Sequence, residues 1–426
     1  MNIKKKKIGD IATIIDGDRG NNYPKQNEFS PSGYCLFLNA GNVTANGFVF
    51  DDNSYITQEK DALLRKGRLS RGDIVYTTRG TIGNVAYYSN TIPYEHLRIN
   101  SGMVILRVNV VEANAAFLYQ YLKSAKVREY FLSFKTGSAQ PQLPIKNFSA
   151  IEIDLPDLPT QRRIASILSA YDDLIENNRR QIKLLAEAAQ RLYREWFVEL
   201  RFPGHESVKV VDGVPEGWKR VQIKDLIAYE IGGGWGSDAP SERDSQEAYV
   251  IRGTDLHGIM HGDYKNLPLR FHSENSLKPR ILQDGDIVFE VSGGGKNEGV
   301  ARTALISTQL LSLLNKPAIC ASFCKLIRPI EIDYSQYMYS YLQFLRASGK
   351  TAEYDKRSAS SIVNYRWKDF LVQEYTLLPE LTVLKHFNRY IDAYYKKITT
   401  CANIISIASD TRDRLLSKLM SREMEV

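Results

Sequence analysis

Apolar residues recur along residues 162–200 in alternating steps of four and three, which is the spacing of one face of a long helix. An average step of 3.5 residues is the period of a coiled-coil seam. Nine of the ten seam positions are apolar, and no Pro or Gly interrupts the run. The pattern therefore predicts a helix with the seam Ile164, Leu168, Tyr171, Ile175, Asn178, Ile182, Leu185, Ala189, Leu192 and Trp196.

A second run with identical steps begins 223 residues later, within residues 382–420. The segment Leu155-Pro156-Asp157-Leu158 before the first run is also matched by Leu378-Pro379-Glu380-Leu381 before the second. Two unrelated amphipathic helices remain an alternative, but the matching register favours an internal repeat. The second seam is Phe387, Ile391, Tyr394, Ile398, Cys401, Ile405, Ala408, Arg412, Leu415 and Leu419.

The two regions that precede these runs differ in sequence but share an order of features. A strand-like segment ends in a small polar turn at residues 37–42, and a similar segment lies at 250–255. A Gly-Asp turn then enters a β-rich run at residues 72–76 and again at 285–289. The sequence therefore predicts an α+β fold with a pseudo-two-fold repeat, in which two mixed α/β domains are separated by a long two-helix coiled coil.

The expected domain organisation is domain, helix, domain, helix. Helices of about 38 residues extend roughly 57 Å, and either packing direction is possible. Antiparallel pairing would place the two globular domains at opposite ends of a rod, related by a pseudo-two-fold axis. The boundaries that we expect are 1–154 for the first domain, 155–200 for the first helical region, 201–217 for a linker, 218–377 for the second domain and 378–426 for the second helical region.

Composition restricts the class of protein. A chain of 426 residues is too long for one ordinary core, and 43% hydrophobic with 25% charged residues is typical of a soluble globular protein. There is no signal peptide or bilayer-spanning run, so we expect no membrane partner. The four cysteines suit neither a disulfide scaffold nor a zinc site, which favours a reducing, cytoplasmic compartment. The net charge of +7 permits nucleic-acid binding but does not demonstrate it.

The common catalytic and cofactor motifs are absent from the sequence. Gly293-Gly294-Gly295-Lys296 is followed by Asn297, so it is not a phosphate-binding loop of the Walker type. There is no Asn/Asp-Pro-Pro-aromatic motif of an amino-methyltransferase and no nucleophile elbow. His257 and His261 are four residues apart, but Gly258 and Gly262 favour a loop over a metal-binding helix. We therefore expect no enzymatic activity, no metal and no cofactor.

Several polar loops are rich in residue types that contact base edges or phosphates. Such loops are ordinarily solvated turns, so each residue alone is a weak candidate. Trp235 lies between two glycines and could stack or wedge, or cap a small surface cluster. The DNA-binding candidates are Arg19, Asn21, Asn22, Lys25, Asn39, Asn42, Thr78, Arg79, Thr81, Ser138 and Gln140 in the first half, and Trp235, Ser237, Arg252, Thr254, Ser292, Lys296 and Asn297 in the second.

The whole chain resembles the DNA-specificity subunit of a type I restriction-modification system. The most specific match is the stretch Pro159-x-Gln161-Arg162-Arg163-Ile164-Ala165-x-Ile167-Leu168-Ser169-x-Tyr171-Asp172-Asp173-Leu174-Ile175-Glu176-Asn177-Asn178. Arg79-Gly80-Thr81-Ile82-Gly83, the paired Gly-Asp-Ile turns and Pro215-Glu216-Gly217-Trp218 support it. The resemblance implies two target-recognition domains held apart by an antiparallel coiled coil.

The resemblance also implies the partners: double-stranded DNA, two adenine methyltransferase subunits, and restriction subunits in the full complex. The specificity subunit itself would perform no chemistry. Because the two domains differ in sequence, we expect an asymmetric target of two short elements separated by an unspecified spacer. A coiled-coil adaptor that binds only proteins is the alternative.

The second helical region departs from the family pattern. Gln161-Arg162-Arg163 is replaced in context by residues 383–385, and Asp172-Asp173 falls on Tyr395-Lys396 at the same offset. The two copies are therefore expected to bind their partner subunits unequally.

Overall fold

The protein was analysed as a computed structural model, which describes residues 3–124, 127, 129–130, 143–264, 266–293, 299–357, 362–421 and 423–424. The chain divides into two compact units. The first unit consists of residues 1–175 and 407–426, and the second consists of residues 176–406. Each of the two long helices therefore contributes one part to each unit.

The first unit is built around a four-stranded antiparallel sheet in the order β2-β10-β7-β8. Its strands are β2 (Ala12–Asp16), β10 (Met103–Val108), β7 (Ile74–Thr77) and β8 (Val85–Tyr87). A three-stranded sheet, β6 (Tyr55–Ile56), β3 (Cys35–Leu38) and β9 (Leu97–Ile99), pairs β3 and β9 in parallel. The remaining strands and helices are β1 (Ile3–Lys7) with β11 (Glu152–Pro156), β4 (Val43–Thr44) with β5 (Gly47–Phe48), α1 (Ile8–Ile11), α2 (Gln58–Leu63), α3 (Ala115–Lys123) and α5 (Ile145–Ser149).

The second unit contains the same three pairings. Its four-stranded antiparallel sheet has the order β15 (Ile227–Gly232), β22 (Cys324–Pro329), β18 (Ile287–Glu290) and β20 (Thr303–Leu305). Its three-stranded sheet is β17 (Leu269–His272), β16 (Gln246–Ile251) and β21 (Ala318–Cys320), with β16 and β21 parallel. The third pairing joins β14 (Lys219–Gln222) to β25 (Tyr375–Leu378).

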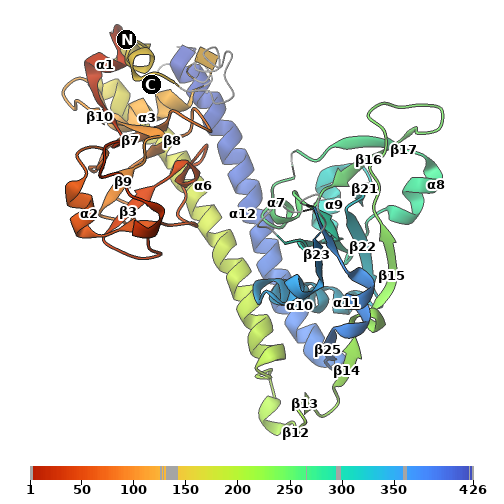
Figure 1. The fold of residues 1–426 in the computed structure, drawn as a ribbon. Coiled ribbons are helices and arrows are strands. Elements are labelled where there is room, and N and C mark those ends of the chain that lie inside the picture. The colour runs from red at the N-terminus through yellow and green to blue at the C-terminus, as the bar shows by residue number, and fades with distance from the viewer. Residues whose placement is uncertain are drawn as a thin grey trace. The chain divides into compact units, whose positions relative to one another are not determined.

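The second unit also has elements of its own. A small sheet joins β19 (Ser292–Gly293), β24 (Val363–Tyr365) and β23 (Asp355–Arg357), and a hairpin joins β12 (Val210–Val211) to β13 (Val214–Pro215). Its shorter helices are α7 (Leu256–Met260), α8 (Glu274–Leu277), α9 (Thr308–Leu314), α10 (Ser335–Ala347) and α11 (Trp367–Gln373). Helix α3 packs on β8 in the first unit (Figure 1). In the second unit α10 packs on β20 and β22.

The repeated Gly-Asp-Ile turns build the same ion pair in both units. The Asp73 carboxylate accepts the backbone N–H of Ser70 and two hydrogen bonds from Arg107 on β10. The Asp286 carboxylate likewise accepts the backbone N–H of Gln283 and two bonds from Arg328. These aspartates are buried, so the motif is explained by the fold of each unit.

The two helical runs form the long helices α6 (Leu158–Tyr193) and α12 (Leu381–Ser421). The sequence predicted a first helix that continues to residue 200, but the α-helical turns end at Tyr193 and a π-helical turn follows at Arg194–Val198. The wider turn shifts the helix face. As a result Tyr193, Trp196 and Phe197 are all buried, although only Trp196 belongs to the predicted seam.

The two helices run antiparallel within each unit. In the first unit Nη1 of Arg412, late in α12, donates to Oδ1 of Asp172, in the first half of α6, at 2.7 Å. In the second unit the ring of Trp196, just after α6, lies 5.9 Å from the ring of Phe387, early in α12. Every predicted seam position is buried or half-buried. The α+β fold class predicted from the sequence is confirmed.

Asp172 explains where the second helical copy departs from the first. Its carboxylate accepts hydrogen bonds from Gln120 at 2.6 Å and from Lys123 at 3.2 Å, in addition to the bond from Arg412. At the matching place in the second unit, the ring of Tyr395 lies 6.1 Å from that of Tyr339 on α10. In the first unit, Asp172 therefore joins α6 to α3 and α12 through a charged cluster. In the second unit, Tyr395 joins α12 to α10 through aromatic packing.

Among the described residues, no helix combines the length and the apolar character that a membrane span requires.

Candidate nucleic-acid interface

Three chain segments meet at the turn between β9 and β10 in the first unit. Gly17, just after β2, packs so close to this turn that an added Cβ would lie 2.1 Å from the carbonyl oxygen of Asn100. Two residues further on, Nη2 of Arg19 donates to the carbonyl oxygen of Ser101 at 3.3 Å. On the other side of the turn, the backbone N–H of Arg79 donates to the carbonyl oxygen of Gly102. Arg19 and Arg79 therefore flank one short turn.

The second unit repeats this arrangement at the turn between β21 and β22. A Cβ added to Gly233 would lie 2.2 Å from the carbonyl oxygen of Ala321. The backbone N–H groups of Val291 and Ser292 donate to the carbonyl oxygen of Phe323 at 2.9 and 3.2 Å. In both units, therefore, a glycine closes one side of the turn and two backbone donors hold its last carbonyl. We call this arrangement the rim of each unit.

The strand registers show which residues correspond between the two rims. Met103 pairs with Thr77 in the first unit, and Cys324 pairs with Glu290 in the second. Counting from these pairs, Gly102 corresponds to Phe323 and Arg79 corresponds to Ser292. In the same way, the pairs Val104 with Asp16 and Lys325 with Gly232 make Arg19 correspond to Trp235. The rim thus presents two arginines in the first unit and two aromatic residues in the second.

Four predicted site residues line one hollow of about 440 Å³ at the second rim, namely Trp235, Arg252, Thr254 and Ser292. Phe323 lines the same hollow, and this residue is 57% exposed. Glu290 and Arg302 also line it, and Arg302 donates two hydrogen bonds to the buried Glu290 carboxylate. The charge of Glu290 is therefore compensated inside the unit, and the polar groups left at the opening belong to exposed or half-buried loops.

Trp235 is held in place although it is 39% exposed. The guanidinium of Arg270 lies over its ring at 4.4 Å from the centroid. Arg270 in turn forms an ion pair with Asp238. Cation–π contact of this kind fixes the ring orientation, while part of the residue remains exposed.

Two predicted DNA contacts are corrected by the structure. Asn42 is buried, and its amide donates to the carbonyl oxygens of Val49 and Asp52. Thr78 is buried as well, and its hydroxyl donates to the carbonyl oxygen of Gly102. Both side chains complete the hydrogen bonding of their own loops, so they are not available to a ligand.

The loop that contains Asn42 recurs in the second unit with the same hydrogen bonds. The side chain of Asn42 accepts the backbone N–H of Asn39, and Asp255 accepts that of Arg252. Arg252 also donates from its guanidinium to both oxygens of Asp255. Asn39 and Arg252 are thus oriented by the loop and remain half-buried at its edge.

The other predicted contacts lie outside this arrangement. Asn21, Lys25 and Thr81 are exposed, whereas the amide of Asn22 donates to the carbonyl oxygen of Leu63. The hydroxyl of Ser237 donates to Asp244 at 2.8 Å. Ser138, Gln140, Lys296 and Asn297 lie outside the residues that the structure describes.

The paired histidines differ from the expectation of a loop. His257 lies in the short helix α7, and His261 follows its end with the two rings 4.2 Å apart. Burial and the neighbouring His261 lower the pKa of His257, which favours the neutral form. Among the described residues, no group of three or more His, Cys, Asp or Glu side chains could hold a metal ion.

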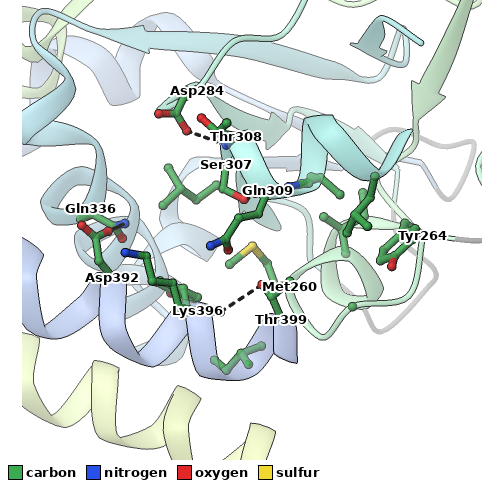
Figure 2. A pocket seen from close by; sticks show the side chains of 17 residues that line it. Met260, Tyr264, Asp284, Ser307, Thr308, Gln309, Gln336, Asp392, Lys396 and Thr399 are labelled. Atoms are coloured by element: carbon green, nitrogen blue, oxygen red, sulfur yellow. Dashed lines mark hydrogen bonds between the residues drawn. The ribbon is translucent and has the colours of Figure 1, made fainter. Parts of the chain in front are cut away.

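A separate cavity of about 230 Å³ in the second unit lies between α12 and the segments that carry α7 and α9. Figure 2 shows Gln336 beside Asp392, and Asp284 beside Thr308. The amide of Gln336 donates to Asp392 at 2.8 Å, and the Asp284 carboxylate accepts the backbone N–H of Thr308 at the start of α9. Within the described residues, these polar groups join elements of the fold and form no pair of nucleophile and base.

Phe323 is not among the site residues that the sequence predicted. Its neighbours Ile319-Cys320-Ala321 and Cys324 are apolar, so the segment reads as a continuous buried strand. The one available signal was the repeat itself, because the corresponding position in the first half is Gly102. A large apolar side chain that replaces glycine in a turn is a candidate for a surface role.

The fold and the two rims define a class of protein: a duplicated chain in which two related units, each with its own exposed rim, share a pair of antiparallel helices. Comparisons with known proteins agree with this class. Residues 1–187 match the type I restriction modification DNA specificity domain. The chain is 26% identical over 375 residues to the type I restriction enzyme MjaIX specificity subunit of Methanocaldococcus jannaschii, covering 84% of this chain and 78% of that protein.

A second relative, the type I restriction enzyme HindI specificity subunit of Haemophilus influenzae, is 27% identical over 187 residues, which are 43% of this chain and 40% of that protein. The fold is similar to the crystal structure of a type I restriction-modification system S subunit from M. genitalium, with a TM-score of 0.57, 15% identity and coverage of 99% and 96% of the two chains. The chain is thus similar to type I restriction-modification specificity proteins, with the family domain matched over its first 187 residues. The resemblance predicted from the sequence is confirmed.

Proposed function

We propose that this chain is the sequence-specific DNA-binding subunit of a type I restriction-modification complex. It binds double-stranded DNA and carries two methyltransferase subunits, joined by restriction subunits in the full complex. The chain itself performs no chemistry, and the complex acts in the cytoplasm. The domains of the proposal are target-recognition domains at 1–154 and 218–377, joined by the linker 201–217 and by helical regions at 155–200 and 378–426.

One observation carries the proposal. The two units build the same rim on the same turn, yet its large side chains differ: the exposed Arg19 and the half-buried Arg79 in one, the exposed Trp235 and Phe323 in the other. A scaffold that repeats while its exposed loop residues change suits recognition of two different short sequences. The proposed target is therefore bipartite and asymmetric.

Retention on duplex DNA at increasing salt concentration tests the proposal. If the chain neutralises roughly six phosphates, the logarithm of its affinity should fall with the logarithm of salt concentration at a slope of about −5. The alternative, an adaptor that binds only proteins, predicts no retention on DNA at any salt concentration. Sequencing of methylated DNA from cells that express the chain with its methyltransferase should then return one bipartite motif, and the absence of any motif would contradict the proposal.

A further inference from the structure

Phe323 is an exposed aromatic side chain on a rigid turn. Its carbonyl oxygen accepts two backbone N–H groups, and the N–H of Cys324 donates to Ala321 at 2.8 Å across the same turn. The main chain is therefore fixed, while the residue as a whole is 57% exposed. Single exposed apolar residues are common on protein surfaces and need no explanation by themselves.

The comparison between the two rims makes Phe323 more than a scattered surface residue. At the corresponding position the first unit has Gly102, and opposite that glycine Arg79 stands where the second unit has Ser292. The pair Arg79 and Gly102 has thus become Ser292 and Phe323. In each unit the backbone hydrogen bonds of the rim join one residue with a long side chain to one small residue. The long side chain comes from the segment after β7 in the first unit and from the turn between β21 and β22 in the second.

The chemistry of the long side chain differs as well. An arginine donates hydrogen bonds and suits a guanine edge, whereas a phenylalanine offers only apolar surface. The apolar group that a base pair presents in the major groove is the C5-methyl of thymine. Trp235 lines the same hollow as Phe323, so the second rim is aromatic on two sides.

We propose that Phe323 is a specificity-determining residue of the second unit, which contacts the methyl group of a thymine in the second target element. The inference rests on the proposed function, because it assigns a base contact within the target. Arg79 is the counterpart in the first unit and contacts a hydrogen-bonding base edge in the first element. The role of Phe323 therefore predicts a T·A pair in the second target element, and no such pair is predicted by Arg79 in the first.

The test uses the full chain assembled with its methyltransferase subunits. The bipartite motif is first read from methylated DNA, and each thymine of the second element is then replaced in turn by deoxyuridine, which lacks only the methyl group. The wild-type complex should lose about fourfold in affinity at one such position, the effect of one buried methyl-sized group. Phe323→Ser should bind thymine and deoxyuridine duplexes equally.

Two control variants separate this inference from a general defect. Ile332→Ser removes another exposed apolar side chain of the second unit, 60% exposed, and should keep the deoxyuridine effect. Arg79→Ala should relax one position of the first element and leave the second unchanged. These controls also show that the variant complexes are folded and bind DNA.

The outcomes that overturn the inference are distinct from those that overturn the proposed function. A wild-type complex without any methylated motif refutes both. A clear bipartite motif whose second element contains no thymine, or whose thymines tolerate deoxyuridine, refutes the role of Phe323 alone. Loss of affinity in Phe323→Ser without any deoxyuridine effect in the wild type would instead indicate stacking or wedging between bases.

Discussion

At the scale of single residues, Asp172 connects three elements of the first unit. Burial raises the pKa of its carboxyl, but the Lys123 ammonium and hydrogen bonds from Gln120 and Arg412 outweigh burial and hold the pKa below its usual value. A depressed pKa contributes stability that is present above the pKa of the unfolded chain, about 3.9, and is lost as the pH falls through the lower folded value.

Asp172→Asn should therefore lower the stability of the first unit by about 2 kcal/mol at neutral pH, because two cations lose their buried partner. The loss should shrink as the pH falls below about 4, where the unfolded chain takes up a proton first, and it should become smallest once the folded carboxylate is protonated as well. Denaturant unfolding measured at several pH values checks both effects. Asp173→Asn, an exposed neighbour, should change little, and equal midpoints for wild type and Asp172→Asn at pH 7 would contradict the role of the cluster.

At the scale of elements, the polar position of the first seam offers a second test. Asn178 is only 4% exposed, and a buried seam asparagine often fixes register at a cost in stability. Asn178→Leu should raise the melting temperature by a few degrees and permit other helix pairings. Thermal unfolding combined with native mass determination checks this. Asn177→Leu on the exposed face is the matched control, and a lower melting temperature with unchanged assembly would argue against the prediction.

The antiparallel pairing of the helices can be tested by chemical crosslinking. Cysteines that replace Asp172 and Arg412 should be joined by a short bifunctional reagent, because these side chains are in contact at 2.7 Å. The natural cysteines are buried and should not interfere. A parallel pairing would instead join Asp172→Cys to Tyr395→Cys, which is the same repeat position in the other helix. Efficient crosslinking of this second pair would overturn the antiparallel arrangement.

At the scale of the whole molecule, the sequence predicts that the long helices determine the spacer of the target. One heptad inserted after Ile175 in α6 and another after Ser406 in α12 would extend both helices while keeping their seams matched. Seven residues add about 10.5 Å, or roughly three base pairs of duplex DNA. The preferred spacer should lengthen by that amount, while both target elements remain the same.

Selection from a library of duplexes with variable spacers measures this effect. Three base pairs also rotate the second element by roughly 100° around the DNA axis, so some loss of affinity should accompany the longer spacer. A heptad inserted in α12 alone serves as the control, because it mismatches the seams and should impair folding. A spacer that does not respond to the paired insertion would show that the helices are not the determinant of spacing.

The sequence by itself determined the features that depend on local periodicity. A step of 3.5 residues needs no tertiary information, so both long helices, their seams and the internal repeat could be predicted. The Gly-Asp turns were recognisable for the same reason, although their ion pairs with Arg107 and Arg328 were not, since these partners lie far along the chain.

Only the tertiary structure decided which polar loop residues are accessible. Asn42 and Thr78 are of residue types that often contact DNA, but each forms hydrogen bonds inside its own unit. Phe323 is of a residue type that is usually buried in the core, yet the turn that fixes its backbone leaves the residue exposed. Burial depends on which distant segments pack around a side chain, and residue type alone does not contain that information.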